Sequence, residues 1–359
     1  MIETITGTVA RITGQREGLV ELEVSVNGQT LPAVAFTQFV PDVQPGDQVV
    51  LNTTARRLSL GSGGYDFVMV NLSRPEHTLQ GSGHIMKLRY TPYQCRVLSV
   101  EEEASPYRET MVDALDLAQT PVIVGELHSQ LVPAAAVLAR RGLSTAYVMT
   151  DGACLPIAWS KNVRDLKARG LLKGTVTAGN AYGGDLEAVN LFSALLAAHA
   201  VFRPDVILVM MGPGIVGTGT KWGFTGVEQG ILLNAADTLG GIPVAIPRVS
   251  FADARERHRG LSHHTVTALM DVCKIRALIP VPILEGEDGR LLQQQVQSAG
   301  LHQRHEVVLQ DGNEVFDAMD AYQLRVTTMG RKADADRAFF QAAGAAAALV
   351  AERFAKKDG

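Results

Sequence analysis

The sequence predicts an α/β protein, with a doubly wound, mostly parallel sheet preceded by a small N-terminal β-barrel domain. The chain has 359 residues, which is too long for one small core. Its first 80 residues contain short segments that alternate at period two, which is typical of a small barrel. From residue 105, apolar runs of strand length alternate with helical segments. That alternation indicates a parallel sheet covered by helices on both faces.

The chain is expected to divide into a barrel domain (1–80), a β-rich connector (81–104) and a Rossmann-like, ligand-binding α/β domain (105–359). Asn27-Gly28 is a hairpin signal within the barrel, and Glu101-Glu102-Glu103 is expected to be a solvated linker. The expected strands of the barrel and connector are 6–12, 19–26, 65–70, 85–90 and 95–100, and residues 45–51 are expected to form a turn that leads into a further strand.

In the α/β domain, the expected strands are the mostly apolar runs 121–125, 145–150, 174–178, 206–211, 243–247 and 279–283. The expected helices lie between and after them, at 130–141, 186–201, 226–239, 263–276, 289–299 and 333–355. The last helix is rich in alanine, which suits either docking onto the domain or formation of a homo-oligomer.

Composition excludes several classes of partner. The net charge is −4 for the chain and −3 for residues 1–80, so we expect neither nucleic acid nor an anionic membrane as a partner. Cys95, Cys154 and Cys273 are far apart in the sequence and form no CxxC motif, which argues against a disulfide framework. The N-terminus lacks the basic start of a signal peptide, and no apolar run is long enough to span a membrane. We therefore expect a cytoplasmic protein.

Polar and titratable residues gather after the expected strands, where open parallel sheets bind their ligands. The segments that precede the expected strands contain fewer titratable residues. The candidates for acid/base chemistry or metal ligation in these segments are Glu126, His128, Asp151, Asp185 and His263.

The most informative segment follows the strand at 206–211. Gly212-x-Gly214-x-x-Gly217 matches the dinucleotide fingerprint, but residues 218–223 are a poor start for the helix that would receive a pyrophosphate. The alternatives are a tight turn or a cradle for a phosphate or carboxylate. The candidate ligand-binding residues are Gly212, Gly214, Gly217, Thr218, Gly219, Thr220, Lys221, Arg248 and Arg257.

Several candidates also have purely structural interpretations. Asp185 could cap the helix at 186–201. His263 and His264 point about 100° apart on a helix, so we do not expect both to face one metal. His128 could pair with Asp151 if the strands that precede them are neighbours. His258 lies in the arginine-rich loop 255–259, which suits either a solvated face or a phosphate clamp.

Long motifs spread over nearly the whole chain add a resemblance. They are Leu51–Ala55, Gly83–Pro92, Gly125–Gln130, Thr150–Ala153, Gly184–Asn190, Gly212–Thr220 and Arg259–Thr265. Together they resemble a bacterial family catalogued as domain of unknown function 3866. The resemblance implies a full-length member of that family and brings no established activity or catalytic residue.

Three functions fit these observations. The first is an enzyme, with a hydrolase or transferase favoured, that acts on a small phosphorylated or otherwise anionic metabolite at the carboxyl edge of the sheet. The second is a non-catalytic ligand sensor whose barrel contacts a partner protein. The third is an NADP-dependent oxidoreductase, in which Arg248 would hold the 2′-phosphate. A divalent metal and NADP both remain open as cofactors, and the sequence does not name the reaction.

Overall fold

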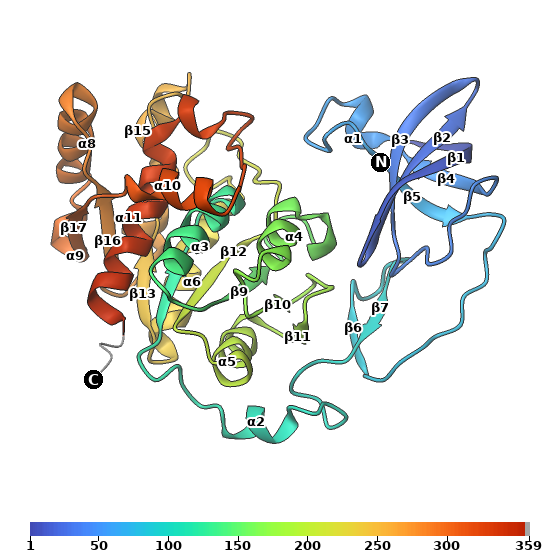
Figure 1. The fold of residues 1–359 in the computed structure, drawn as a ribbon, viewed down its shortest axis with the longest axis horizontal. Helices are drawn as coiled ribbons and strands as arrows, with labels where there is room; N and C mark the ends of the chain where they lie inside the picture. Colours follow the sequence, from blue (N-terminus) through green and yellow to red (C-terminus); the bar gives the residue numbers. More distant parts are fainter. Residues whose placement is uncertain (356–359) are drawn as a thin grey trace. The chain divides into compact units, whose positions relative to one another are not determined.

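The computed structural model describes residues 1–355. The chain forms two compact units, Met1–Leu98 and Ser99–Gly359, and each is described separately (Figure 1). Among the described residues, no helix combines the length and the apolar character needed to cross a bilayer.

The first unit contains a closed five-stranded barrel, as the sequence predicts. Its strands follow the order β1-β2-β3-β5-β4, and β1 closes the barrel by antiparallel pairing with β4. Buried valine and leucine side chains such as Leu22, Val24 and Leu51 alternate with exposed ones and fill its interior. The strands are β1 (Thr4–Arg16), β2 (Leu19–Val26), β3 (Gln29–Phe36), β4 (Gln48–Asn52) and β5 (Asp66–Asn71), with the short helix α1 (Thr54–Arg57).

Strand β3 was not expected from the sequence. Asn27-Gly28 joins β2 to β3, and both residues have the positive φ, 49° and 80°, of a tight hairpin turn. Pro32 interrupts the strand pattern in the sequence. In the structure it pairs with Glu23 of β2, while pairing with β5 begins only at Ala33. At that position the missing N–H of proline is tolerated.

The segment after the barrel forms a short antiparallel pair, β6 (Ile85–Lys87) and β7 (Cys95–Val97). β6 is shorter than expected, because Leu88 and Tyr90 adopt positive φ and turn the chain away. β7 also ends earlier than expected, at Val97. The expectation of a solvated linker at 101–103 is wrong for Glu101, whose carboxylate accepts the N–H of Val189 at 3.1 Å.

The second unit is built on an eight-stranded parallel sheet, which confirms the predicted α/β fold. The strand order is β11-β10-β9-β12-β8-β13-β16-β17. β12 therefore lies between β8 and β9, although it follows both of them in the chain. The strands are β8 (Pro121–Val124), β9 (Thr145–Thr150), β10 (Gly174–Ala178), β11 (Leu186–Ala188), β12 (Val206–Met211), β13 (Ile242–Ala245), β16 (Leu278–Pro282) and β17 (Glu306–Gln310).

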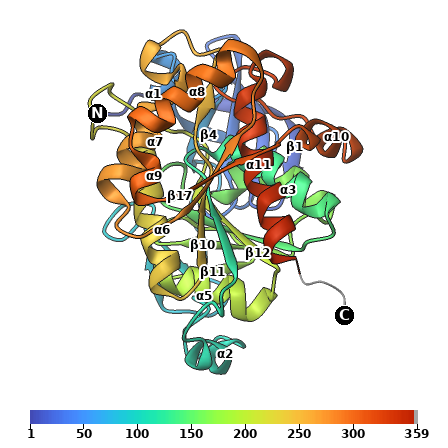
Figure 2. The same ribbon diagram turned by 90° about the vertical axis from the view of Figure 1, so that its left-hand side faces the viewer.

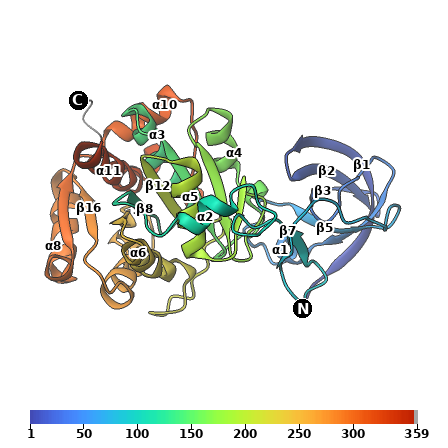
Figure 3. The same cartoon turned by 90° about the horizontal axis from the view of Figure 1, so that it is seen from below.

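Helices cover both faces of this sheet. One layer holds α3 (Leu131–Arg140), α10 (Glu314–Ala321) and α11 (Arg337–Phe354), which pack together (Figure 2). The other layer holds α5 (Leu191–Phe202) and α6 (Glu228–Thr238), and Figure 3 shows α6 and α11 on opposite sides of the sheet. The alanine-rich stretch of α11 is buried against its own unit. Other helices are α2 (Arg108–Asp113), α4 (Lys161–Ala168), α8 (Gly286–Ser298) and α9 (Leu301–Arg304).

Two of the expected helices are wrong in part. Residues 186–188 form β11, and α5 begins only after Asn190, whose side chain caps it. The expected helix at 263–276 is one α-turn, α7 (His263–Val266), followed by a π-helical segment, Thr267–Val272. π-Helical turns are rare and frequently occur at functional sites.

Candidate functional site

The candidate site lies where the chain leaves β13 at the carboxyl edge of the sheet. The small antiparallel pair β14 (Val249–Ser250) and β15 (Gly260–Leu261) follows, and the loop between these strands carries Arg255, Arg257 and His258. α7 starts directly after β15 and is capped by Ser262, whose hydroxyl oxygen accepts the N–H of His264 at 3.2 Å. The arginine-rich loop and the two histidines of α7 are thereby placed side by side.

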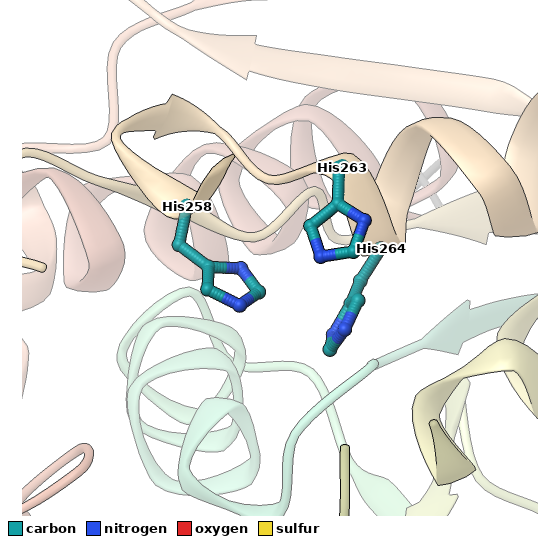
Figure 4. A group of neighbouring side chains, drawn as sticks. All are labelled: His258, His263 and His264. Carbon is teal, nitrogen blue, oxygen red and sulfur yellow. The ribbon is translucent and has the colours of Figure 1, made fainter. Parts of the chain in front are cut away.

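Three histidines converge in this region (Figure 4). Ring centroids lie 4.9 Å apart for His258 and His263, 4.7 Å for His258 and His264, and 4.4 Å for His263 and His264. One ring nitrogen from each lies within 4.8 Å of those of the other two. The expectation that His263 and His264 cannot face one ion is therefore wrong. Their Cβ atoms diverge at the start of the helix, but rotation of the side chains brings the rings together.

The environment of each ring is different. His258 and His264 are buried, and His263 is half-buried. The Nδ1 of His258 is 2.8 Å from the hydroxyl of Ser262, and Phe224 stacks on His264 with ring centroids 3.7 Å apart. The Nε2 of His263 is buried without a hydrogen-bond partner in the described part of the chain.

The surroundings of His258 and His263 favour the neutral form of both rings. Burial, together with the charges of Arg248 and Arg255, lowers the pKa of His258 to about 3. Burial, followed by the nearby His264 and Arg257, also lowers the pKa of His263. Neutral imidazole has one nitrogen lone pair available for a proton or a metal ion.

A network of buried charged side chains, Glu126, Arg248 and Asp253, lies next to the three histidines. The Oε2 atom of Glu126 accepts the Thr265 hydroxyl at 2.8 Å, whereas Oε1 has no hydrogen bond within residues 1–355. Oε1 lies 3.3 Å from the Nδ1 of His264 and 3.6 Å from the Arg248 guanidinium. Arg248 also contacts Asp253 at 3.4 Å. Arg248 is thus a buried member of this network, which differs from the exposed position that the 2′-phosphate hypothesis requires.

Asp253 connects this network to the arginine-rich loop. Its carboxylate accepts a hydrogen bond from Arg255 at 2.7 Å, and that bond holds the pKa of Asp253 well below its usual range although burial opposes the shift. Arg257, in contrast, is exposed and forms no ion pair with any described residue. Its guanidinium is therefore available to a ligand.

The glycine- and threonine-rich loop folds back on itself beside the histidines. The Thr218 N–H donates to the Gly223 carbonyl at 2.8 Å, and the Gly223 N–H donates to the Thr220 hydroxyl at 3.1 Å. Lys221 forms an ion pair with Asp271 at 3.0 Å. α6 begins only at Glu228, so no helix N-terminus lies inside the fingerprint to receive a pyrophosphate.

Two cavities adjoin the cluster. The first, of about 150 Å³, lies between the glycine-rich loop and the arginines; its lining includes Gly217, Gly219, Arg248, Arg255, Arg257, His258 and His264. The second, of about 630 Å³, is lined by residues that include Lys221, Arg257, Arg259 and His263. Arg257 lines both cavities. Gly212, Gly214, Thr218 and Thr220, which the sequence also proposes as ligand-binding, line neither one.

His128 lies apart from this cluster in a closed hydrogen-bond network. Its Nε2 is 2.6 Å from the Ser160 hydroxyl, its Nδ1 is 3.1 Å from the Met211 carbonyl, and burial lowers its pKa to about 4. The premise that its strand neighbours that of Asp151 is wrong, because β12 separates β8 from β9. The carboxylate of Asp151 instead accepts the N–H of Asn180 at 2.9 Å.

Asp185 does not cap a helix, because β11 follows it. Its carboxylate accepts the N–H and hydroxyl of Thr175, both at 2.8 Å, and pairs with Lys167 at 2.6 Å. Burial raises its pKa, but these hydrogen bonds outweigh burial and lower the pKa overall. These contacts tie the start of β11 to β10 and give Asp185 a structural role.

Sequence reasoning missed one titratable group. Glu228 accepts the Thr150 hydroxyl at 2.7 Å, and burial, together with the charge of Asp151, raises its pKa to about 7. A carboxyl that titrates near neutral pH suits general acid or base catalysis. In the sequence Glu228 resembles any acidic residue in the first turn of a helix, so no signal distinguishes it.

The protein is of the α/β class. Histidine, arginine and carboxylate side chains contact one another at the carboxyl edge of its parallel sheet. The chain belongs to the family described as "Protein of unknown function (DUF3866)", whose model matches residues 32–347. The resemblance seen in the sequence is thereby confirmed. No curated protein matches the chain.

Proposed function

We propose that the chain is an enzyme, either a hydrolase or a transferase, that acts on a small phosphorylated or otherwise anionic metabolite. The observation that carries this proposal is the cavity of about 150 Å³ that three arginines, two histidines and two glycines line beside the carboxyl edge of the sheet.

The charges of the cavity favour an anion. Asp253 pairs with Arg248 and Arg255, but Arg257 retains an unpaired guanidinium, whose planar donors suit a phosphate or a carboxylate. The facing glycines have no side chain, so a ligand can approach their backbone closely.

The size of the cavity limits what it holds. Pockets that enclose a whole small-molecule ligand measure about 300–1,000 Å³. A cavity of about 150 Å³ therefore suits the anionic group alone, and the cavity of about 630 Å³ on the other side of Arg257 can take the rest of the metabolite.

The neighbouring side chains supply acid/base chemistry. Glu126 presents an oxygen without a hydrogen bond in the described structure, which can take part in proton transfer. The imidazole of His258 stays neutral and can donate a hydrogen bond to a bound anion. Buried, oriented groups of this kind beside an anion-binding cavity favour catalysis over ligand binding alone.

The test is ligand binding followed by turnover, on the full chain after treatment with a chelator. Inorganic phosphate, pyrophosphate, sugar phosphates and nucleotides are screened by thermal shift, and hits are measured by calorimetry. Arg257→Gln should weaken binding about tenfold or more, because it removes a charge-assisted hydrogen bond. The matched control is Arg290→Gln, an exposed arginine on α8.

Phosphorus NMR of the bound metabolite then separates the hypotheses. Consumption of the ligand supports the enzyme, and binding without product favours the sensor. If no anion binds, or if Arg257→Gln binds as the wild type does, the proposed site is wrong. A change in tryptophan fluorescence with NADPH but not with phosphate would instead favour the oxidoreductase.

A further inference from the structure

We infer that His258, His263 and His264 form a binding site for a divalent transition metal, with Zn²⁺ as its first candidate. The inference goes beyond the proposed anion binding and does not depend on it. It rests on the convergence of the three rings, on the contacts of their other nitrogens and on the charges around them.

The ligand set is the first observation. Three imidazoles with donor nitrogens within 4.8 Å of one another match the nitrogen ligands that Zn²⁺ prefers. Nitrogens bound to one tetrahedral zinc at about 2.0–2.1 Å lie about 3.3 Å apart. The rings therefore need to draw together by an ångström or so, which small side-chain rotations provide. His263, which is half-buried, has the most room to move.

The contacts of the other ring nitrogens are the second observation. A histidine that binds a metal almost always donates its remaining N–H to an oxygen, which orients the ring. The Nδ1 of His258 lies 2.8 Å from the Ser262 hydroxyl, to which it can donate. The Nδ1 of His264 lies between the Arg248 guanidinium at 3.5 Å and the Glu126 carboxylate at 3.3 Å, and it forms no hydrogen bond with that carboxylate. His258 thus keeps Nε2 for a metal, and the Nε2 of His263 is buried without a partner among the described residues.

The charges around the three histidines favour an anionic fourth ligand for the metal. Glu126 and Asp253 offset Arg248 and Arg255, whereas Arg257 remains unpaired beside the cluster. A zinc ion held by three neutral imidazoles keeps its full charge and leaves one position open. Hydroxide or an anionic oxygen of a ligand suits that position, because two of the three histidines line the same cavity as the arginines.

The test uses the metal alone, so its outcome is separate from that of the anion screen. The full chain is stripped with a chelator and titrated with Zn²⁺ by calorimetry and with Co²⁺ by visible absorption. We expect one ion per chain and the intense absorption of tetrahedral cobalt. His263→Ala should weaken binding by more than the roughly 100-fold that loss of an outer contact can cost, and its half-buried position should leave the fold intact.

Two further variants make the test specific. Glu126→Gln should weaken binding about tenfold, because it removes the negative charge that lies 3.3 Å from the Nδ1 of His264 and offsets the charge of Arg248 beside the site. His302→Ala changes an exposed histidine on α9 and should leave binding unchanged. No binding at micromolar Zn²⁺ would overturn the site, as would a His263→Ala protein that binds cobalt with the wild-type affinity and spectrum.

Discussion

Replacement of Arg248 by methionine should destabilise the α/β unit through the charge that it leaves behind on Glu126. Both side chains are almost completely buried, and their closest charged atoms are 3.6 Å apart. Methionine retains much of the length and apolar contact of the arginine stem, so the main change is the loss of the positive charge.

The expected loss in the free energy of unfolding depends on the contacts that Glu126 and Asp253 keep after Arg248 is replaced. Removal of one partner of a buried ion pair costs about 3–5 kcal/mol. Asp253 keeps its 2.7 Å contact with Arg255, and Glu126 keeps the Thr265 hydroxyl, so we expect the lower end, about 3 kcal/mol. Glu126→Gln alone should cost about 1 kcal/mol, since Arg248 still pairs with Asp253.

Urea unfolding followed by tryptophan fluorescence measures this effect in the intact chain. Trp159 and Trp222 are the two tryptophans of the sequence, and both lie in the second unit, so the signal reports on that unit alone. In the double variant with Glu126→Gln no uncompensated carboxylate remains. The two substitutions should therefore be non-additive by about 2 kcal/mol.

Two results would refute this reasoning. One is an Arg248→Met protein whose free energy of unfolding lies within about 1 kcal/mol of the wild type, well below the expected cost of a broken buried pair. The other is strict additivity in the double-mutant cycle, which would show that Arg248 and Glu126 are not coupled.

Three further outcomes are expected. Because the folded pKa of Glu228, about 7, exceeds its ordinary 4.5, its contribution to stability is complete below the ordinary value and is lost as the pH rises through 7. Glu228→Gln should therefore gain up to about 3 kcal/mol at pH 8 and less at pH 5 in urea unfolding, and equal gains would contradict the assignment. His128→Leu should cost about 2 kcal/mol, because the buried Ser160 hydroxyl loses its contact with the ring and keeps only the Val163 N–H, while calorimetry shows unchanged phosphate binding; lost binding with full stability would return His128 to the site. Asp185→Ala should cost about 1–2 kcal/mol, because Thr175 loses its acceptor, and a normal unfolding midpoint would argue against this structural role.

The sheet was predictable where strands are buried on both faces. The runs at 145–150 and 206–211 are mostly apolar because helices cover them on both sides, and they appear as β9 and β12 with the expected bounds. The missed strands lie at the two edges. β17 is partly exposed and carries polar residues, and β11 has only three residues, so neither gives an apolar run.

The sequence predicted where the candidate site lies better than it predicted which residues form it. Glu126, His263, Arg248 and Arg257 do lie together after their strands. His128 does not join them, because Ser160 and the Met211 carbonyl enclose it. Contacts of this kind depend on segments distant in the chain, and no local pattern reports them.

The sequence by itself determined the barrel, the parallel sheet and the edge at which polar residues gather, because period-two alternation and buried apolar runs are local properties. Only the tertiary structure decided which of those residues meet. The position of β12 between β8 and β9 separates His128 from Asp151, and the β14–β15 pair brings His258 to the two histidines of α7. The physical reason is that strand order and side-chain rotation arise from packing over the whole sheet, whereas sequence spacing constrains only near neighbours.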